Sequence, residues 1–394
     1  VFPSGFAVTL LTQMGTLIIF ALSYNMLLGQ AGMLSFGHAV YSGRGAYFTV
    51  HALNLLGKSW GWVTPLPLLP LVGGLAGLAF GVIFGYVTTK RAGTIFAMIS
   101  LGIGELVYAC VLMFPGFFGG EAGISTNRTV GQPLFGLTFG PAIQVYYLAA
   151  AWCFACMLAM YALTHTPLGR MANAVRDNPE RAAFVGYDTQ RVRFLQLVLS
   201  SFFAGIAGGL SCIIFEIVTA ENVSALRSGG VLLATFIGGI PYFFGPVLGA
   251  VIFVFFVGAL SGFTKAWLLY LGLFFCLMVL YAPGGVASLV LMQVGLVRAG
   301  RFGRMAGPYA VAAAALLVAL AGLIGLVESV YRLSDVTSNP EMELFGFAVN
   351  AREPGVYVVS ALLLAGGLVA LRHAARFVSA RWDTVQQELK AAAA

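Results

Sequence analysis

The sequence predicts an all-α polytopic membrane protein with about ten transmembrane segments, some of them broken or re-entrant. Of its 394 residues, 60% are hydrophobic and only 9% are charged, which excludes a soluble globular protein. Roughly ten apolar runs are long enough to cross a bilayer, for which a helix needs about 20 residues. Segments of alternating hydrophobicity, which a transmembrane barrel would need, do not occur. Because backbone groups in lipid must be hydrogen-bonded within their own segment, helices are the expected spanning form.

The predicted spans follow one another along the whole sequence. They are 6–28, 34–53, 66–89, 94–114, 142–163, 194–217, 224–240 with 245–261, 265–282, 308–330 and 356–377. Four basic groups are expected on the cytoplasmic side, because short cytoplasmic loops carry an excess of Lys and Arg. They are Lys90 with Arg91, the loop 165–193, Arg298 with Arg301 and Arg304, and the tail Arg372, Arg376 and Arg381. The loops 54–65, 115–141 and 331–355 are then external.

Glycine and proline interrupt two of the apolar runs, where a helix must break. In the run 224–261 the breaking residues are Gly238, Gly239, Pro241, Gly245 and Pro246. We expect this run to form a hairpin that enters and leaves the membrane from the outside. Broken backbone at membrane depth is tolerated only inside protein or beside a water-filled cavity.

A second glycine-rich stretch, 29–37, holds Gly32 and Gly37. It is not a nucleotide-binding loop, because no strand precedes it and the spacing of its glycines differs. Helix–helix packing and a half-helix that faces a pathway are both compatible with this stretch.

The longest charged stretch between two apolar segments, 164–193, is built as a docking element with eight charges. Its apolar residues fall on one face of a short helix, at Leu168, Met171 and Val175. Residues 178–180 (Asn-Pro-Glu) then start a second helix with a cap, a first-position proline and a first-turn carboxylate. Gly186 is expected to end it in the left-handed conformation. An ordinary basic cytoplasmic loop is the alternative interpretation.

Polar and ionisable side chains inside spans are costly in lipid and are therefore functional candidates. The candidate translocation-path residues are Gln30, Ser35, His38, Arg44, Tyr47 and Glu105. On this interpretation Arg44 meets an anionic group on an aqueous path. The alternatives are an Arg44–Glu105 ion pair inside the bundle, or a side chain that reaches toward the interface. Glu216, near the outer end of its helix, is interpreted as structural.

Small residues recur at a spacing typical of close helix contacts. They are Gly73, Gly77, Gly81 and Gly85, with Gly205 and Gly209 repeating the pattern. All five cysteines lie in apolar runs without further ligands nearby, so packing roles are expected and a metal site is not. No basic, cleavable leader is evident at the start of the sequence.

Motifs along residues 1–290 resemble those of LivM-type permeases, the membrane subunits of branched-chain amino acid ABC importers. They are the opening signature Asn25–Tyr41 with Gly45–Tyr47, the fourth-helix pattern 90–105, the external glycine loop 118–123, and the closing motifs 238–250 and 282–286. The docking segment is similar to the family's coupling loop, with Glu180, Ala182, Ala183 and Gly186 in register. By this resemblance, the residues that couple the permease to ATPases are Gly169, Arg176, Asp177, Asn178, Glu180, Ala182, Ala183 and Gly186.

The resemblance implies an ABC importer permease fold, in a subunit of an ATP-driven importer of the bacterial cytoplasmic (inner) membrane. The solute would be a branched-chain amino acid or a related small amino-acid-like or carboxylate solute, although relatives also carry amides, urea, and aromatic or dicarboxylic acids. The implied partners are a LivH-like second permease, two ABC ATPase subunits, a periplasmic substrate-binding protein and membrane lipid, but no nucleic acid.

The chain has no Walker sequence and no catalytic constellation, so it is not expected to be an enzyme. ATP and Mg²⁺ would belong to the partner ATPases, and no cofactor is expected in this chain. A secondary transporter or channel without ATPases is the alternative hypothesis, since broken helices and buried charge suit that class too. Such a protein does not need a capped double helix at 164–193. A membrane-embedded enzyme is less favoured still.

The expected domain organisation follows from where the resemblance ends. Residues 1–290 form the permease transmembrane domain, with the coupling loop 164–193, and 291–394 form an extension with two further transmembrane helices and a basic tail. Two residues depart from the family's pattern. Arg44 replaces a usually apolar residue, and Pro241 falls where glycine is more frequent.

Overall fold

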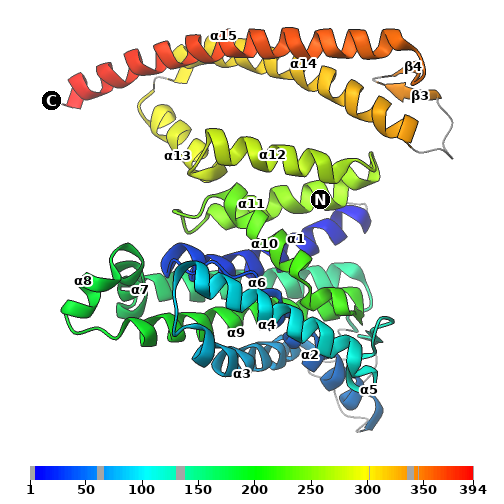
Figure 1. Ribbon diagram of the computed structural model, residues 1–394, viewed down its shortest axis with the longest axis vertical. Helices are drawn as coiled ribbons and strands as arrows, with labels where there is room; N and C mark the ends of the chain where they lie inside the picture. The colour runs from blue at the N-terminus through cyan, green and yellow to red at the C-terminus, as the bar shows by residue number, and fades with distance from the viewer. Residues whose placement is uncertain are drawn as a thin grey trace. The chain divides into compact units, whose positions relative to one another are not determined.

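A computed structural model describes residues 5–59, 66–129, 138–300, 302–334, 341–344 and 346–393 (Figure 1). Arg301 and parts of the predicted loops 54–65, 115–141 and 331–355 lie outside the described residues. In the described part, eight helices are long and apolar enough to cross a membrane, or nine if a pair bent by 56° counts as one span. The prediction of an all-α polytopic membrane protein is therefore confirmed.

The chain forms two compact units, Val1–Ala259 with Leu271–Ser288, and Leu260–Tyr270 with Leu289–Ala394. The helices up to residue 254 are α1 (Gly5–Asn25), α2 (Ala39–Ser59), α3 (Leu69–Thr88), α4 (Gly93–Met113), α5 (Pro115–Phe118), α6 (Ala142–His165), α7 (Pro167–Asp177), α8 (Pro179–Phe184), α9 (Thr189–Phe215), α10 (Ala225–Gly238) and α11 (Gly245–Val254). The remaining helices are α12 (Trp267–Tyr281), α13 (Gly285–Arg298), α14 (Phe302–Ser334) and α15 (Pro354–Ala393). The strands are β1 (Ile124–Ser125), β2 (Ile217–Val218), β3 (Glu341–Leu344) and β4 (Phe347–Asn350).

Each predicted span contains a helix, but several boundaries differ. Helix α2 begins at Ala39, because residues 31–38 are irregular. Helix α9 begins at Thr189, where the Asp188 carboxylate accepts hydrogen bonds from the backbone amides of the next turn at 3.0 and 3.1 Å. Helix α15 runs well beyond its apolar part, over 40 residues. Helix α13, the second half of the bent pair, was not predicted.

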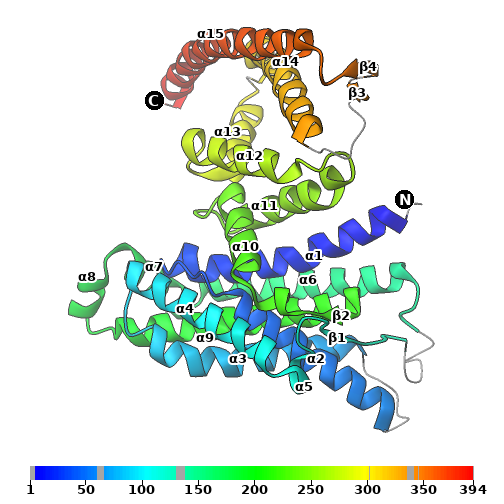
Figure 2. The ribbon, with the colours of Figure 1, turned by 45° about the vertical axis from the view of Figure 1, so that its right-hand side comes forward.

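Helix α9 is the centre of the first unit. In its apolar stretch 83% of the residues are buried, against 39% or less in the other candidate spans. Figure 2 shows α9 between α1 and α3. The glycine ridge of α3 packs directly on α9: a Cβ at Gly77 would collide with the carbonyl oxygen of Ser201, and one at Gly205 with that of Gly73. The predicted close contact of small residues is confirmed, and backbone packs on backbone along this interface.

We expect Gly77→Ala to destabilise the first unit, because the added methyl group forces α3 away from α9. Overpacking of this kind costs about 1–3 kcal/mol. Unfolding in detergent, followed by circular dichroism against denaturant concentration, measures the loss. Gly272→Ala in α12 is the matched control, since no atom lies within 4 Å of its Cβ position. Equal stability of the two variants would contradict the packing argument.

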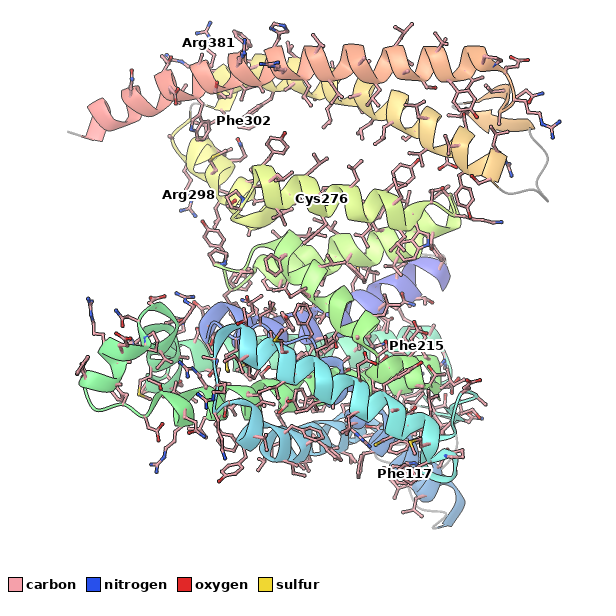
Figure 3. The ribbon with its side chains drawn as sticks, viewed as in Figure 1. Phe117, Phe215, Cys276, Arg298, Phe302 and Arg381 are labelled. Atoms are coloured by element: carbon pink, nitrogen blue, oxygen red, sulfur yellow. The ribbon has the colours of Figure 1, made fainter. Side chains whose placement is uncertain are left out.

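The second unit contains a helical hairpin of α14 and α15, joined across the antiparallel strands β3 and β4. Gly322 lies against Ser360 and Leu364, and Gly367 lies against Ala319, so the two helices run antiparallel with small residues between them. In Figure 3, Arg298 and Arg381 lie at the same end of this unit. Leu296, Met305 and Val385 form a small apolar core that includes residues of α13, α14 and α15.

Candidate functional site

The docking segment folds as two short capped helices, as predicted. The Thr166 hydroxyl caps α7, and the Asn178 side chain accepts a hydrogen bond from the amide of Arg181 at 2.9 Å to cap α8. Gly186 has a φ of +94°, which favours glycine, and follows the end of α8. Local sequence signals therefore fix both helix starts and the final turn.

One side of the docking segment is buried and the other is exposed. Gly169, Ala172 and Val175 are the buried residues of α7, and Ala182 is the buried residue of α8. At the end of α8, Phe184 is 89% exposed, and Val185, which follows it, is 71% exposed. Phe117 and Phe215, labelled in Figure 3, lie at the end of the first unit away from α7 and α8. The docking segment thus presents apolar side chains at one end of the helical bundle.

The first predicted break lies next to this segment. Helix α1 passes into a π-helix, Met26–Gln30, and then into irregular chain up to His38. Gly32 has a φ of +66°, and a Cβ at Gly37 would collide with the carbonyl oxygen of Ser100. Both glycines are therefore required where the chain turns, at the position where a break was predicted. The π-helical form of the break was not predicted.

Arg176 connects the docking segment to this break. Its guanidinium donates a hydrogen bond to the carbonyl oxygen of Gly29 in the π-helix and bonds to the neighbouring Asp177 carboxylate at 2.9 Å. A Cβ at Gly32 would lie 2.8 Å from the Cγ of Arg176. The last turn of α7 is therefore packed on, and hydrogen-bonded to, the broken end of the first span.

The second break forms the predicted hairpin of α10 and α11. The two helices cross closely, since a Cβ at Gly238 would collide with the carbonyl oxygen of Gly245. Pro246 occupies the first turn of α11 and Pro241 lies in the turn between the helices. In the structure this run reverses at the glycines and prolines.

The hairpin turn contacts two other glycine motifs. Gly239 has a φ of +114°, and a Cβ there would collide with the carbonyl oxygen of Gly284. On the other side, a Cβ at Gly29 would lie 3.0 Å from the carbonyl oxygen of Ile240. Segments near residues 29, 176, 240 and 284 thus meet in one place, which we call the break junction.

Buried polar side chains form hydrogen bonds around the first break. Gln196 of α9 donates to the side chain of Gln30 at 2.8 Å and to the carbonyl oxygen of Met26 at 3.1 Å. His38 lies 3.1 Å from the Ser23 hydroxyl. The backbone carbonyl of Ser35 accepts a hydrogen bond from the Tyr24 hydroxyl at 2.9 Å. Of the predicted path residues, Ser35 and His38 both contact Tyr24, Gln30 contacts Gln196, and all three are buried.

The other predicted path residues lie elsewhere. Arg44 and Tyr47 are buried on α2, whereas the side chain of Glu105 is exposed on α4. Among the described residues Arg44 forms no ion pair with Glu105. Instead its guanidinium lies over the rings of Phe80 and Phe118. Of the two structural alternatives for Arg44, the ion pair is not observed.

Sequence reasoning missed Arg128, which holds the outer end of α9. Its side chain donates to the carbonyl oxygens of Phe139 at 2.8 Å and Ile214 at 3.2 Å. Its backbone amide donates to the Glu216 carboxylate at 2.8 Å. Glu216 itself has a φ of +55°. The structural interpretation of Glu216 fits this placement, but no local sequence signal points to Arg128, because all of its acceptors are distant in sequence or lie outside regular elements.

Spanning helices with two internal breaks and a capped docking segment define the class of a multi-pass membrane permease. The chain belongs to the family described as "Branched-chain amino acid transport system / permease component", whose sequence model matches residues 6–283. It is similar to the high-affinity branched-chain amino acid transport system permease protein LivM of Escherichia coli (strain K12), with 27% identity over 71% of this chain and 69% of that protein.

Two further relatives agree. LivM of Salmonella typhimurium is 28% identical over the same shares of both chains. The probable branched-chain amino acid transport permease LivH of Methanocaldococcus jannaschii is 24% identical over 60% of this chain and 74% of that protein. No solved structure matches the chain. The predicted LivM-type family is confirmed, and a secondary transporter or channel is not favoured. As a permease component, the chain is not itself catalytic.

We expect Gly239→Ala to disrupt the break junction. The added methyl group collides with Gly284, and alanine is strained at the φ of +114° that glycine adopts here. Strain at such a position costs about 1–3 kcal/mol. Gly229→Ala in the same hairpin is the control, since no atom lies within 4 Å of its Cβ position. The amount of each variant in the membrane and its thermal unfolding temperature measure the effect. Equal unfolding temperatures for the two variants would contradict a tight contact at Gly239.

Proposed function

We propose that this chain is a permease subunit of an ATP-driven importer in the bacterial inner membrane. Its solute is a branched-chain amino acid or a related small amino-acid-like or carboxylate solute, in keeping with the names of its relatives. A LivH-like second permease, two ABC ATPases and a periplasmic substrate-binding protein complete the assembly. ATP and Mg²⁺ bind the ATPases, and this chain holds no cofactor of its own.

The observation that carries this proposal is the contact between the docking segment and the break junction. Arg176 joins α7 to Gly29, and Gly29 touches the hairpin turn at Ile240. Closure of the ATPase dimer would push on α7 and α8 and shift both broken spans together. Packed backbone of this kind moves as rigid pieces and favours two discrete arrangements, which alternating access requires.

The exposed end of the docking segment is the proposed ATPase contact. Phe184, Val185 and Tyr187 are apolar or aromatic and exposed on a cytoplasmic element, where such side chains indicate a binding surface. The buried Gly169, Ala172 and Val175 fix the segment to the bundle behind them. The other predicted coupling residues, Asp177, Asn178, Glu180 and Ala183, shape or border this surface.

We also assign the exposed face of α4 to the translocation path or the second permease. Glu105 is an ionisable residue in a span, and its side chain is not covered by this chain. A carboxylate at membrane depth is too costly in lipid to face it. Water or a protein neighbour on that face removes the cost. The translocation path reaches the buried Gln30, Ser35 and His38 only when the break junction rearranges.

We extend the proposal to the domain organisation. Residues 1–290 carry transport, and the matched residues 6–283 fall within them. Residues 291–394 are an extension whose helices α14 and α15 contact membrane lipid through their exposed Leu and Val side chains.

We expect Gly186→Val to uncouple transport from ATP hydrolysis. Valine is strained at a φ of +94°, so the turn after α8 is lost while the bundle still inserts. Solute-stimulated ATP hydrolysis by the reconstituted transporter should fall by about tenfold, which corresponds to about 1.4 kcal/mol. Gly300→Val, also at a positive φ with no atom within 4 Å, is the control outside the docking segment. Normal stimulation in Gly186→Val would refute the docking role.

Arg176→Gln tests the link to the break junction. The substitution leaves the Gly29 carbonyl without its charged donor. A hydrogen bond of this kind contributes about 1.5–3 kcal/mol, so the contact between α7 and the break should weaken by about tenfold to a hundredfold. We expect the ATPases to remain bound while uptake per ATP hydrolysed declines. Arg372→Gln, an exposed arginine of α15, is the charge-matched control. If Arg176→Gln instead loses the ATPases, while the complexes that remain take up as much solute per ATP as before, then Arg176 serves only as a docking contact and the link to the break junction is contradicted.

A further inference from the structure

We propose that Arg44 and Tyr47, with the rings of Phe80 and Phe118, form the binding site for the carboxylate of the transported solute. This inference rests on the proposed function and names the chemical group that the permease recognises. All four residues belong to the first unit: Arg44 and Tyr47 on α2, Phe80 on α3 and Phe118 on α5.

Two aromatic rings hold the guanidinium of Arg44. The central carbon of the guanidinium lies 4.8 Å from the centroid of Phe80 and 4.8 Å from that of Phe118, and the residue is only 8% exposed. Contacts of a cation with two ring faces are attractive and fix the orientation of the side chain. A phenyl ring has no lone pair, so neither ring acts as a conventional hydrogen-bond acceptor for the N–H groups of Arg44.

The N–H groups of Arg44 have no acceptor among the described residues. Arg44 makes no hydrogen bond and no ion pair there, and its Nε is fully buried without a partner. The other two guanidinium nitrogens are not among the fully buried atoms without a partner. A guanidinium has five donors and cannot lose its charge, and a buried charge without a counter-charge is strongly unfavourable. The site therefore fits an anion.

Tyr47 provides a second free donor on the same helix face. It lies three residues after Arg44 on α2, which places both side chains on one side of the helix. The Tyr47 hydroxyl is buried without a hydrogen-bond partner, and its ring packs edge-on against Phe118 with centroids 5.1 Å apart. Two unpartnered donors thus lie beside the same ring.

The geometry favours a carboxylate. A carboxylate accepts two parallel hydrogen bonds from a guanidinium and one more from a hydroxyl. The surrounding cluster is apolar and includes Val107 and Val111 of α4. Apolar walls with two convergent polar groups suit a small carboxylic acid with a hydrocarbon body. Glu105 does not compete for Arg44, since its side chain is exposed.

The test uses the complete transporter in nanodiscs without the periplasmic binding protein, so that only the membrane site selects the ligand. The probes are leucine, leucinamide, which lacks the carboxylate, and 4-methyl-2-oxopentanoate, which lacks the amine. We expect leucine and the oxo acid to raise the thermal unfolding temperature in a concentration-dependent manner, and leucinamide not to do so. A shift with leucinamide equal to that with leucine, or no shift with any probe, would overturn the proposal.

Variants then assign the site. Arg44→Leu should weaken the apparent affinity for leucine by about tenfold to a hundredfold, and Tyr47→Phe by about tenfold. Arg44→Lys keeps the charge but not the paired hydrogen bonds, so it should restore stability without restoring affinity. Arg91→Leu, an exposed cytoplasmic arginine, should bind as the unmodified protein does. Normal leucine binding by both Arg44→Leu and Tyr47→Phe would also overturn the proposal.

The carboxylate site and the proposed importer function are contradicted by different measurements. If Arg44→Leu fails to fold, Tyr47→Phe and the three probes still decide the outcome. If the solute-loaded binding protein stimulates ATP hydrolysis but leucine and leucinamide bind equally well, the proposed function stands and only the carboxylate-site inference fails. If no solute stimulates ATP hydrolysis, the importer function itself fails.

Discussion

The fold depends on one constraint: backbone groups freed by a broken helix must find partners inside the protein, because lipid offers none. The break after Asn25 frees such groups next to the docking segment, and side chains from other helices bind them. Arg176 donates a hydrogen bond to the carbonyl of Gly29, and Gln196 donates one to the carbonyl of Met26. The Ser228 hydroxyl accepts a hydrogen bond from the backbone amide of Ala39 at 3.0 Å. These bonds join α7, α9 and α10 to the break, so three other helices hold the end of the first span in place.

At the second break, close backbone contacts hold the broken span in place. A Cβ at Gly285 would collide with the backbone of Gly239, so the turn of the hairpin and the start of α13 exclude any side chain between them. Close-packed interfaces are not continuously deformable, and they respond to a push by moving as units or by repacking. The break junction therefore couples two broken spans mechanically, without a chain of flexible side chains.

Local signals in the sequence predicted the breaks, the docking helices and the glycine ridge, because Gly, Pro and capping residues act on their own neighbourhood. Contacts across long sequence distances were not predictable. The target of Arg176 lies 147 residues away, and that of Gln196 lies 166 or 170 residues away. The π-helix and α13 were also missed, since neither has a compositional signal that separates it from ordinary apolar helix. The side chain that meets Arg44 was left open for the same reason, and the structure supplies two phenylalanines.

Arg44 and Glu105 were equivalent in the sequence, as two charges of opposite sign in apolar spans, but the structure gives them different chemistry. Glu105 is exposed to whatever lies beside α4. Arg44 is not, because it is buried between aromatic rings, and its guanidinium keeps its charge. A permanent cation that is held by rings, and not by an anion of its own chain, is free to bind an anion that comes and goes. A transported solute meets that description, whereas a fixed carboxylate would bind Arg44 permanently and close the site.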